Sequence, residues 1–386
     1  MISVDEALSH IFELATPLET ETVPLRAASG RVLAEPLLAT RSQPPFRASV
    51  MDGYAVAGEA ENYSVVGESA AGRGFEGAIG PEEAVRIFTG APVPENATRV
   101  IIQEDVTREG DRIRVAAGAD PEPFIREVGT DFVAGFRIDA PRRMSPADIT
   151  LAASMNAPGI VVARQPRVAL IATGDELVMP GESPRPDQII ASNAFGLSAM
   201  VESEGGAARM LPICADTAPS LEAALGMAED ADLIVTIGGA SVGMHDLVAS
   251  TALRMGFERA FHKVAIRPGK PMLAGRLNGT AMVGLPGNPV SSMVCGHVFL
   301  RPMLRAMQGL EARPLARRTA RLSASVDANG PREHYMRAQV TNDLVAPEER
   351  QDSSLLTILS GANALIVRPP DSPALDAGDA VAFVEF

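Results

Sequence analysis

Apolar residues follow helical spacing at the two ends of the first 163 positions and strand-like spacing between them. One face of residues 4–16 carries Val4, Ala7, Leu8, Ile11 and Leu14. This spacing predicts an amphipathic helix, and residues 145–156 predict a second helix, followed by a strand over 160–163. Between them, short β-like runs are separated by glycine, proline and asparagine: 63–66, 84–88, 99–103 and 112–116. A small β domain is therefore expected to interrupt an N-terminal helical module.

The pattern changes at residue 167, where fully apolar runs begin to alternate with helical segments. Strands are expected over 168–172, 209–214 and 232–237, and helices over 194–204, 219–228 and after Pro289. Fully apolar strands alternating with helices are typical of a parallel sheet covered on both faces. Two further runs, 272–277 and 280–285, flank Asn278-Gly279, a strong hairpin signal. After about residue 312 the segments are again short and strand-like.

These patterns predict a multidomain fold of α/β plus β type. Its centre is a three-layer α/β/α domain with a parallel-rich sheet, over residues 164–311. The other expected units are an inserted β domain at 41–131, a C-terminal β domain at 312–386, and a discontinuous N-terminal helical and linker domain at 1–40 and 132–163. A chain of 386 residues is long enough for two to four such units.

Composition excludes several classes of protein. The net charge of −14 argues against non-specific binding to nucleic acid or to an anionic membrane surface. No apolar run is long enough to span a bilayer, and the start of the chain lacks the features of a signal peptide. Cys214 and Cys295 alone make neither a disulfide framework nor a cysteine metal site. A cytoplasmic location is therefore expected.

Lysine is almost absent from the chain, and its two occurrences are close together. Of the 34 basic residues other than histidine, only Lys263 and Lys270 are lysines. With Arg267 they place three cations around the turn Pro268-Gly269. Lysine is a compact point charge, whereas arginine is a broad planar fork. We infer that this segment binds an oxyanion and that two of its positions need the compact cation.

Three glycine-containing loops follow the predicted parallel strands. They are Thr173-Gly174-Asp175-Glu176, the segment 238–243 that includes Gly238, Gly239, Ser241 and Gly243, and the segment 284–291 that includes Gly284, Pro286, Gly287 and Asn288. Ligands of open α/β sheets bind beyond the carboxyl ends of the strands. Glycines there let backbone N–H groups approach an anion, and a helix N-terminus adds a favourable dipole. One such loop alone indicates only a tight turn, but three on one edge predict a phosphate-binding site.

Carboxylates accompany these loops. Glu176, Asp216 and Asp246 all fall at the same predicted edge. Mg²⁺ prefers oxygen ligands and bridges to substrate phosphates, so Glu176 and Asp246 are the expected metal ligands. A helix cap or a solvated side chain is the competing interpretation of any single aspartate, and it applies most strongly to Asp216.

Two strings in the N-terminal half indicate only turns by themselves: Val50-Met51-Asp52-Gly53-Tyr54-Ala55 and Phe88-Thr89-Gly90-Ala91-Pro92-Val93-Pro94. Together with Thr173-Gly174-Asp175-Glu176-Leu177, Gly239 with Ser241-Val242-Gly243, Pro268-Gly269-Lys270-Pro271 and the 284–291 string, they stand in the order found in one family. The chain resembles the molybdopterin molybdotransferases, which include the E domain of gephyrin. The resemblance extends over essentially the whole sequence.

The resemblance implies a fold, a reaction and an assembly. It implies that residues 164–311 form a molybdopterin-binding domain and that the chain is a Mg²⁺-dependent transferase of molybdenum cofactor biosynthesis. Molybdate would be inserted into the dithiolene of adenylylated molybdopterin, and AMP would leave. An elongated homodimer is implied, with each active site shared between subunits, and a molybdopterin adenylyltransferase is a possible partner.

The resemblance also assigns roles to residues. Asp52 and Thr89 would face the site from the partner subunit, and Glu176, Asp175, Asp216 and Asp246 would serve metal and substrate. Lys263, Lys270 and Arg267 would hold molybdate or phosphate, and Ser353 would approach the site from the C-terminal domain. Arg267 stands where many members have a third lysine. In the segment 125–131 only Arg126, Gly129 and Asp131 match the family pattern.

Two alternatives remain open. An adenylyltransferase acting one step earlier uses the same α/β domain, but the flanking β domains and the Asp52-Gly53-Tyr54 string favour metal insertion. A non-catalytic scaffold could keep the fold, but the retained Glu176, Asp246 and two lysines argue against it.

Overall fold

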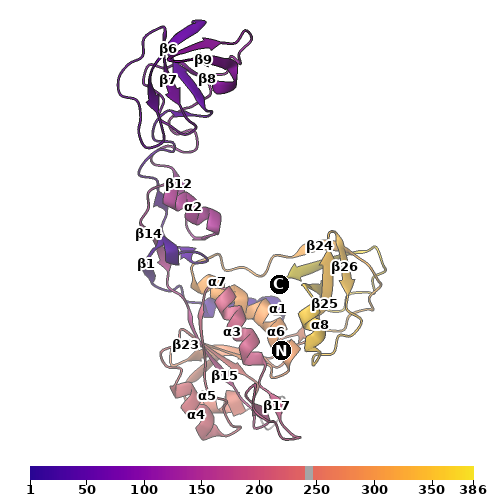
Figure 1. Ribbon diagram of the computed structural model, residues 1–386. Coiled ribbons are helices and arrows are strands. Elements are labelled where there is room, and N and C mark those ends of the chain that lie inside the picture. The colour runs from indigo at the N-terminus through magenta and orange to yellow at the C-terminus, as the bar shows by residue number, and fades with distance from the viewer. Residues whose placement is uncertain (240–246) are drawn as a thin grey trace.

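The computed structural model describes residues 1–239 and 247–386 and has an elongated, bent shape (Figure 1). A small β domain lies at the far end of an arm. The α/β domain and the C-terminal β domain lie together at the other end, close to both chain termini (Figure 1). No helix within the described residues is long and apolar enough to cross a membrane.

The small β domain is a six-stranded sheet with the order β8-β5-β7-β6-β10-β9. Its strands are β5 (Gly53–Val56), β6 (Asn62–Ser69), β7 (Glu83–Ile87), β8 (Arg99–Ile102), β9 (Val106–Glu109) and β10 (Arg112–Val115). The turn expected around Gly53 is wrong: β5 is a strand paired with both β7 and β8. Two short strands, β4 (Ala48–Ser49) and β11 (Ile125–Arg126), pair beside this sheet.

A four-stranded sheet and one helix form the arm. The sheet has the order β1-β14-β2-β13, with β1 (Thr20–Pro24), β2 (Val32–Leu33), β13 (Arg142–Arg143) and β14 (Gly159–Ala163). Helix α2 (Pro146–Ser154) begins with a capping box between Ser145 and Asp148. The pair β3 (Leu37–Leu38) and β12 (Arg137–Ile138) leads from the arm toward the small β domain.

The α/β domain is built on a six-stranded sheet with the order β18-β15-β19-β23-β22-β20. Four strands are parallel: β18 (Ala207–Met210), β15 (Arg167–Ala172), β19 (Leu233–Ile237) and β23 (Thr280–Leu285). The hairpin partner β22 (Leu273–Leu277) and the edge strand β20 (Phe257–His262) are antiparallel. The strand expected over 209–214 ends at Met210, and Cys214 only forms an isolated bridge with Thr173.

Helices cover both faces of this sheet, which confirms the three-layer prediction. Val168 and Leu170 of β15 pack in one cluster with α3 (Asn193–Ser203), α6 (Pro289–Cys295) and α7 (Arg301–Met307). Ala169 and Ile171 pack in another with α4 (Ala218–Gly226) and α5 (Leu247–Arg254). The alternation follows from strand geometry, because successive side chains point to opposite faces. Helix α1 (Val4–Leu14) buries its apolar face in the first cluster.

The C-terminal domain is a small closed barrel. Its strands are β24 (Arg318–Leu322), β25 (Glu333–Thr341), β26 (Leu344–Pro347), β27 (Ala364–Arg368) and β28 (Ala380–Glu385). They follow the order β25-β26-β24-β28-β27, and β27 pairs back onto β25. Strand β21 (Ile266–Arg267) of the α/β domain adds to β25, and helix α8 (Leu356–Gly361) packs against α6.

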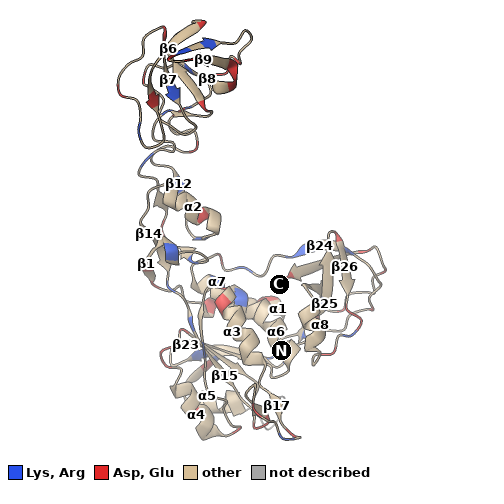
Figure 2. Ribbon diagram, in the orientation of Figure 1, with Lys and Arg blue, Asp and Glu red and all other residues tan. Residues whose placement is uncertain are grey.

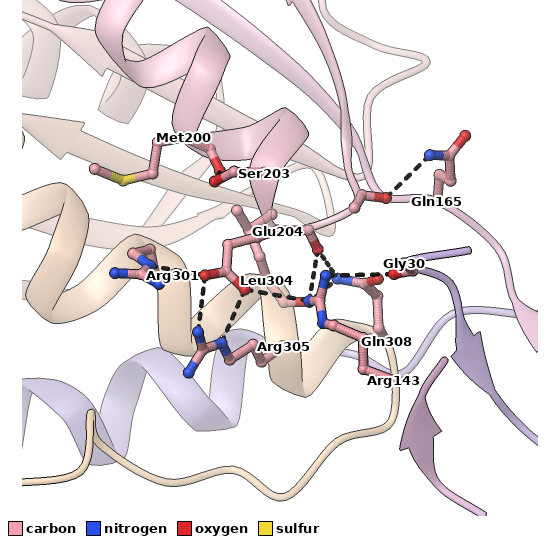
Figure 3. Close-up of polar contacts among 11 residues, drawn as sticks. Gly30, Arg143, Gln165, Met200, Ser203, Glu204, Arg301, Leu304, Arg305 and Gln308 are labelled. Carbon is pink, nitrogen blue, oxygen red and sulfur yellow. Dashed lines mark hydrogen bonds and ion pairs between the residues drawn. The ribbon is translucent and has the colours of Figure 1, made fainter. Parts of the chain in front are cut away.

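A buried glutamate joins the arm to the α/β domain. Glu204, at the C-terminal end of α3, is 3% exposed and contacts Arg143 of the arm as well as Arg301 and Arg305 of α7 (Figure 3). The side-chain amide of Gln308 donates to the Glu204 carbonyl oxygen at 2.7 Å. Elsewhere acidic and basic residues are spread along all the domains (Figure 2).

Candidate active site

A pocket of about 720 Å³ lies at the carboxyl ends of the parallel strands. It is lined by the ends of β15 and β19, by the loop after β23, and by the first residues of α3 and α6. Sequence-predicted residues that line it are Gly174, Glu176, Asp216, Gly238, Gly239, Pro286, Gly287 and Asn288. The three loops therefore meet at one cavity.

Glycine is required in these loops by close packing. Gly239 has a φ of +65°, and a Cβ there would lie 2.5 Å from Cγ2 of Val248. Gly174 has a φ of +147°, and a Cβ there would collide with the carboxylate of Glu176. Both positions adopt a conformation that L side chains rarely take, and at Gly239 the branched side chain of Val248 also leaves no space for a Cβ. The backbone thus lines the pocket directly, as a phosphate-binding loop requires.

Carboxylates from two loops line the pocket. Glu176 follows β15, and its backbone carbonyl accepts a hydrogen bond from Ile189 N at 2.8 Å. Asp216 follows Cys214, and its backbone N–H donates to Oδ1 of Asp175 at 3.0 Å. Asp175 thus orients the Asp216 loop and is not itself among the lining residues. Behind this loop, burial raises the pKa of the Cys214 thiol, so that thiol stays protonated at neutral pH.

Two helices begin at the pocket wall. Ser192, Asn193 and Ala194 line it at the start of α3, and Asn288 and Pro289 line it at the start of α6. Asn193 donates through Nδ2 to the Gly287 carbonyl at 2.7 Å, which connects the two starts. The positive ends of the two helix dipoles therefore favour an anionic ligand in this cavity.

The two lysines lie beside the pocket rather than in its wall. Lys263 directly follows β20 and has a φ of +71°, and its N–H donates to the Met272 carbonyl at 2.8 Å. Lys270 accepts a hydrogen bond from Val264 N at 3.1 Å, so the two lysines belong to one compact loop. Pro271, next to Lys270, lines the pocket. Among residues 1–239 and 247–386, neither lysine ammonium forms an ion pair.

Three other predicted residues, Arg267, Ser353 and Gly284, do not line the pocket. Arg267 is exposed and lines a second cavity in the C-terminal domain, not the pocket at the sheet edge. The Ser353 carbonyl accepts a hydrogen bond from Val290 N at 3.1 Å, which fixes the C-terminal domain against the start of α6. Gly284, the penultimate residue of β23, is buried beneath the loop that it precedes.

Asp52 and Thr89 form a dyad in the small β domain. Oδ1 of Asp52 accepts hydrogen bonds from the Thr89 backbone N–H at 2.7 Å and from the Thr89 hydroxyl at 2.8 Å. These two bonds lower the pKa of Asp52, which is half-buried. Arg86 lies between the rings of Tyr54 and Phe88 beside the dyad. Within one chain, the small β domain lies far from the pocket of the α/β domain (Figure 1).

Four other predicted residues are not brought to the pocket by the described structure. Arg126 is exposed on β11 of the small β domain, also at the far end of the arm. Ser241, Gly243 and Asp246 lie outside the described residues. Among the residues that are described, no group of three or more histidine, cysteine, aspartate and glutamate side chains could hold a metal ion.

One wall of the pocket was not predicted from the sequence. It is formed by the segment 177–193, where β16 (Leu177–Val178) pairs in parallel with β17 (Ile189–Ile190). Ile189 is 57% exposed, so it presents an apolar edge at the pocket mouth. Two adjacent isoleucines after a proline-rich loop were the available signal, because exposed apolar pairs often contact a ligand.

Three family models match this chain. The MoeA N-terminal region, described as domains I and II, matches residues 2–156. A probable molybdopterin-binding domain matches 169–306, and the MoeA C-terminal region, domain IV, matches 319–386.

Curated relatives match over most of their length. Molybdopterin molybdenumtransferase 2 of Mycobacterium tuberculosis is 35% identical over 396 aligned residues, covering 98% of each chain. Molybdopterin molybdenumtransferase of Haemophilus influenzae is 35% identical, over 80% of this chain and 78% of that protein. The Bacillus subtilis protein of the same name is 30% identical, over 98% and 93%.

Solved structures share the whole architecture. Two crystal structures of the molybdopterin biosynthesis MoeA protein from Pyrococcus horikoshii superpose with a TM-score of 0.84, at 29% and 25% sequence identity. Each alignment covers 100% of this chain and at least 99% of the other. The predicted fold class, with all its domains in one chain, is confirmed.

Proposed function

This chain belongs to the molybdopterin molybdenumtransferase family, and on that basis we propose that it inserts molybdate into the dithiolene of adenylylated molybdopterin with release of AMP. The observation that supports this most strongly is the pocket at the sheet edge. Three backbone loops and two helix starts converge there on one cavity, with Glu176 and Asp216 in its wall. That combination suits a substrate that carries a pyrophosphate link.

The roles of the pocket residues follow from their chemistry. The loops that contain Gly174, Gly239 and Gly287 would hold the pyrophosphate through backbone N–H groups. Lys263 and Lys270 would hold the incoming molybdate, because compact ammonium groups fit beside a tetrahedral oxyanion. Water would add to one phosphorus as the phosphoanhydride bond between the molybdopterin phosphate and AMP breaks, so that both products leave as phosphate monoesters. These donors would stabilise the negative charge that develops on the leaving phosphate.

We extend the proposal to magnesium. Mg²⁺ is usually bound by one or two carboxylates together with substrate phosphates, so it does not need a three-residue cluster. Glu176 in the pocket wall fits that donor set, and Asp246 would be the second ligand. When bound, the ion would neutralise the pyrophosphate. Without a cation, the Glu176 carboxylate would repel the substrate.

A shared active site in a homodimer is also part of the proposal. Asp52 and Thr89 are a preorganised pair, yet in one chain they lie at the opposite end from the pocket. A second subunit that brings this dyad to the pocket would account for both facts. Arg126 and Asp131 would reach the site from the same side. A cytoplasmic location and a transient complex with an adenylyltransferase fit this activity.

A paired assay tests the reaction class. Purified protein is given either molybdopterin with ATP and Mg²⁺, or adenylylated molybdopterin with molybdate and Mg²⁺. We expect no adenylylation in the first reaction, and in the second AMP release together with a product that activates an apo-molybdoenzyme. Adenylylated product in the first reaction would instead assign the earlier step. Absence of both activities, with no restoration of molybdoenzymes in a transferase-deficient strain, would indicate a scaffold.

Mixing two inactive subunits tests the shared site. Heterodimers of Asp52→Ala and Glu176→Ala subunits contain one site with both lesions and one with neither. We expect partial recovery of activity in the mixed dimer. Purified heterodimers with no recovered activity would contradict a shared site.

A further inference from the structure

A second cavity opens in the C-terminal barrel and is separate from the pocket at the sheet edge. Its volume is about 350 Å³, and it shares no lining residue with the larger pocket. Its walls come from the segment 324–329, from His334 and Met336 of β25, from the segment 347–351, and from Arg267 and Arg368. Barrel mouths are common ligand sites, because the strands converge on a preformed hollow.

Strand alternation places this cavity at the open end of the barrel. Ile366 and Ala338 belong to the apolar cluster inside the barrel, whereas Tyr335 and Val367 belong to the cluster shared with the α/β domain. Side chains two positions apart share a face, so His334, Met336 and Arg368 point to the inner side. The cavity therefore lies on the opposite face of β25 from Arg337, whose guanidinium donates to Gln351 and to the Asp352 carbonyl.

Arg368 is a buried cation with unused hydrogen-bond donors. It is 1% exposed, and its Nη2 donates to the Pro373 carbonyl oxygen. Within residues 1–239 and 247–386, its Nε and Nη1 atoms have no hydrogen-bond partner. Burial lowers the pKa of Arg368. A buried charged group with unsatisfied donors is costly unless a ligand completes it.

Two arginines and three carboxylates line the cavity, and its histidine is neutral. His334 is 6% exposed. Burial, together with the charges of Arg267, Arg337, Arg332 and Arg368, lowers its pKa to about 3, so the imidazole is neutral. Asp327, Glu348 and Glu349 also line the cavity, but none of them forms an ion pair with Arg368 or Arg267 in the described structure. The cavity thus contains a buried arginine and an exposed one.

We propose that the open end of the C-terminal barrel is an oxyanion-binding site, in which Arg368 and Arg267 hold a tetrahedral anion. Inorganic phosphate, sulfate and molybdate share the required chemistry, since each accepts hydrogen bonds from guanidinium groups. The cavity is larger than a bare oxyanion, so water or the remainder of a phosphate ester fits beside the bound group. The site is independent of the reaction assigned to the larger pocket.

Calorimetric titration of the full chain with sodium phosphate, sulfate or molybdate, at constant ionic strength set with chloride, tests this site. Ser325 is an exposed residue of the cavity wall, and Ser325→Glu places a carboxylate at the opening without altering the core. We expect the variant to bind the anion at least tenfold more weakly, because like charges repel. The matched control is Ser323→Glu, which adds the same charge two residues away, outside the cavity.

A second variant removes the donors themselves. Arg368→Met should abolish the binding that Ser325→Glu weakens, provided that its circular dichroism spectrum is unchanged. If that variant does not fold, the Ser325→Glu comparison decides alone. Loss of binding for all three anions supports a general oxyanion site, and loss for molybdate alone supports a site for the substrate anion. Identical affinity and stoichiometry in wild type and Ser325→Glu would overturn the proposal.

Discussion

Glu204→Gln should weaken the junction between the arm and the α/β domain more than any surface substitution does. The carboxylate accepts four hydrogen bonds: Oε1 from Nε of Arg301 at 2.7 Å and Nη2 of Arg305 at 2.9 Å, and Oε2 from Nε of Arg305 at 2.8 Å and Nη2 of Arg143 at 3.2 Å (Figure 3). An amide keeps the shape but removes the charge. Its NH₂ group would also face two donors, because a glutamine side chain has one acceptor oxygen.

The expected loss follows from burial. Removing one partner of a buried ion pair costs about 3–5 kcal/mol, because the remaining charge is left without compensation. Here three guanidinium groups would face one another around an uncharged amide. The side chains of Arg143 and Arg305 are 31% and 36% exposed, so solvent compensates part of the loss. We therefore expect a decrease in unfolding free energy of about 3 kcal/mol, at the lower end of that range.

The effect should also depend on pH. Burial alone would raise the pKa of Glu204, but hydrogen bonds from Arg305 and Arg301 outweigh it, and the net pKa is lowered. A lowered pKa in the folded state means that the stabilisation is fully present above the unfolded value of about 4.3. It is lost as the pH falls through the folded pKa. The difference between wild type and Glu204→Gln should therefore shrink in acid.

Urea unfolding followed by circular dichroism measures the unfolding free energy of wild type and Glu204→Gln. The transition of the α/β domain is analysed separately because the chain has several domains. Glu202→Gln is the matched control, since Glu202 is exposed on the same helix. The control should change stability by no more than about 0.5 kcal/mol. A loss below about 1 kcal/mol for Glu204→Gln, or one equal to that of the control, would refute the reasoning.

Three further predictions concern charged groups elsewhere. Thr89→Val removes one hydrogen bond to Asp52 and should move the pKa of that carboxyl up toward its ordinary value; a carbon NMR titration that shows no change would contradict the dyad. Lys263→Arg and Lys270→Arg keep the charge, yet at least one should slow AMP release by roughly 10²-fold, since positioned contacts are worth about that much; wild-type molybdate dependence in both would show that compactness is irrelevant. Asp232, whose burial is outweighed by hydrogen bonds from Arg164 and Arg167, has a pKa lowered to about 2. Its stabilising effect should therefore be present above about pH 4 and lost toward pH 2, whereas Asp232→Asn should remove this acid transition in thermal unfolding.

The central domain could be predicted from sequence because its elements follow local periodicity. Strands β15, β19 and β23 are almost entirely apolar, since both of their faces are covered. Their loops must then meet at one edge, so the position of the pocket followed from topology. Helix α2 lies where the sequence predicted a helix, over residues 145–156.

Other elements were missed for identifiable reasons. All four residues of β5 are buried, so it shows no alternation, and it begins with the glycine of an Asp-Gly pair, which usually forms a turn. In β20 a register shift between Arg259 and Phe261 breaks the period of two. The edge strand β20 was therefore not predicted, and the helix α5 before it was not predicted either.

The placement of Arg267 depends on contacts distant in sequence. Its strand β21 pairs with β25, so His334 lies opposite Arg267. Sequence reasoning grouped Arg267 with the two lysines because they share one short segment. The structure turns its side chain toward the barrel cavity, while the lysine loop stays beside the main pocket. No local pattern distinguishes these two directions.

Single-turnover AMP release from adenylylated molybdopterin, with and without molybdate, tests the central claim most directly. The wild-type chain should release AMP in step with molybdenum incorporation. Glu176→Gln, which removes a pocket carboxylate with little change in shape, should release it far more slowly and respond less to Mg²⁺. Wild-type rates and an unchanged Mg²⁺ titration in Glu176→Gln would contradict the account, because the reaction would then not depend on the pocket at the sheet edge.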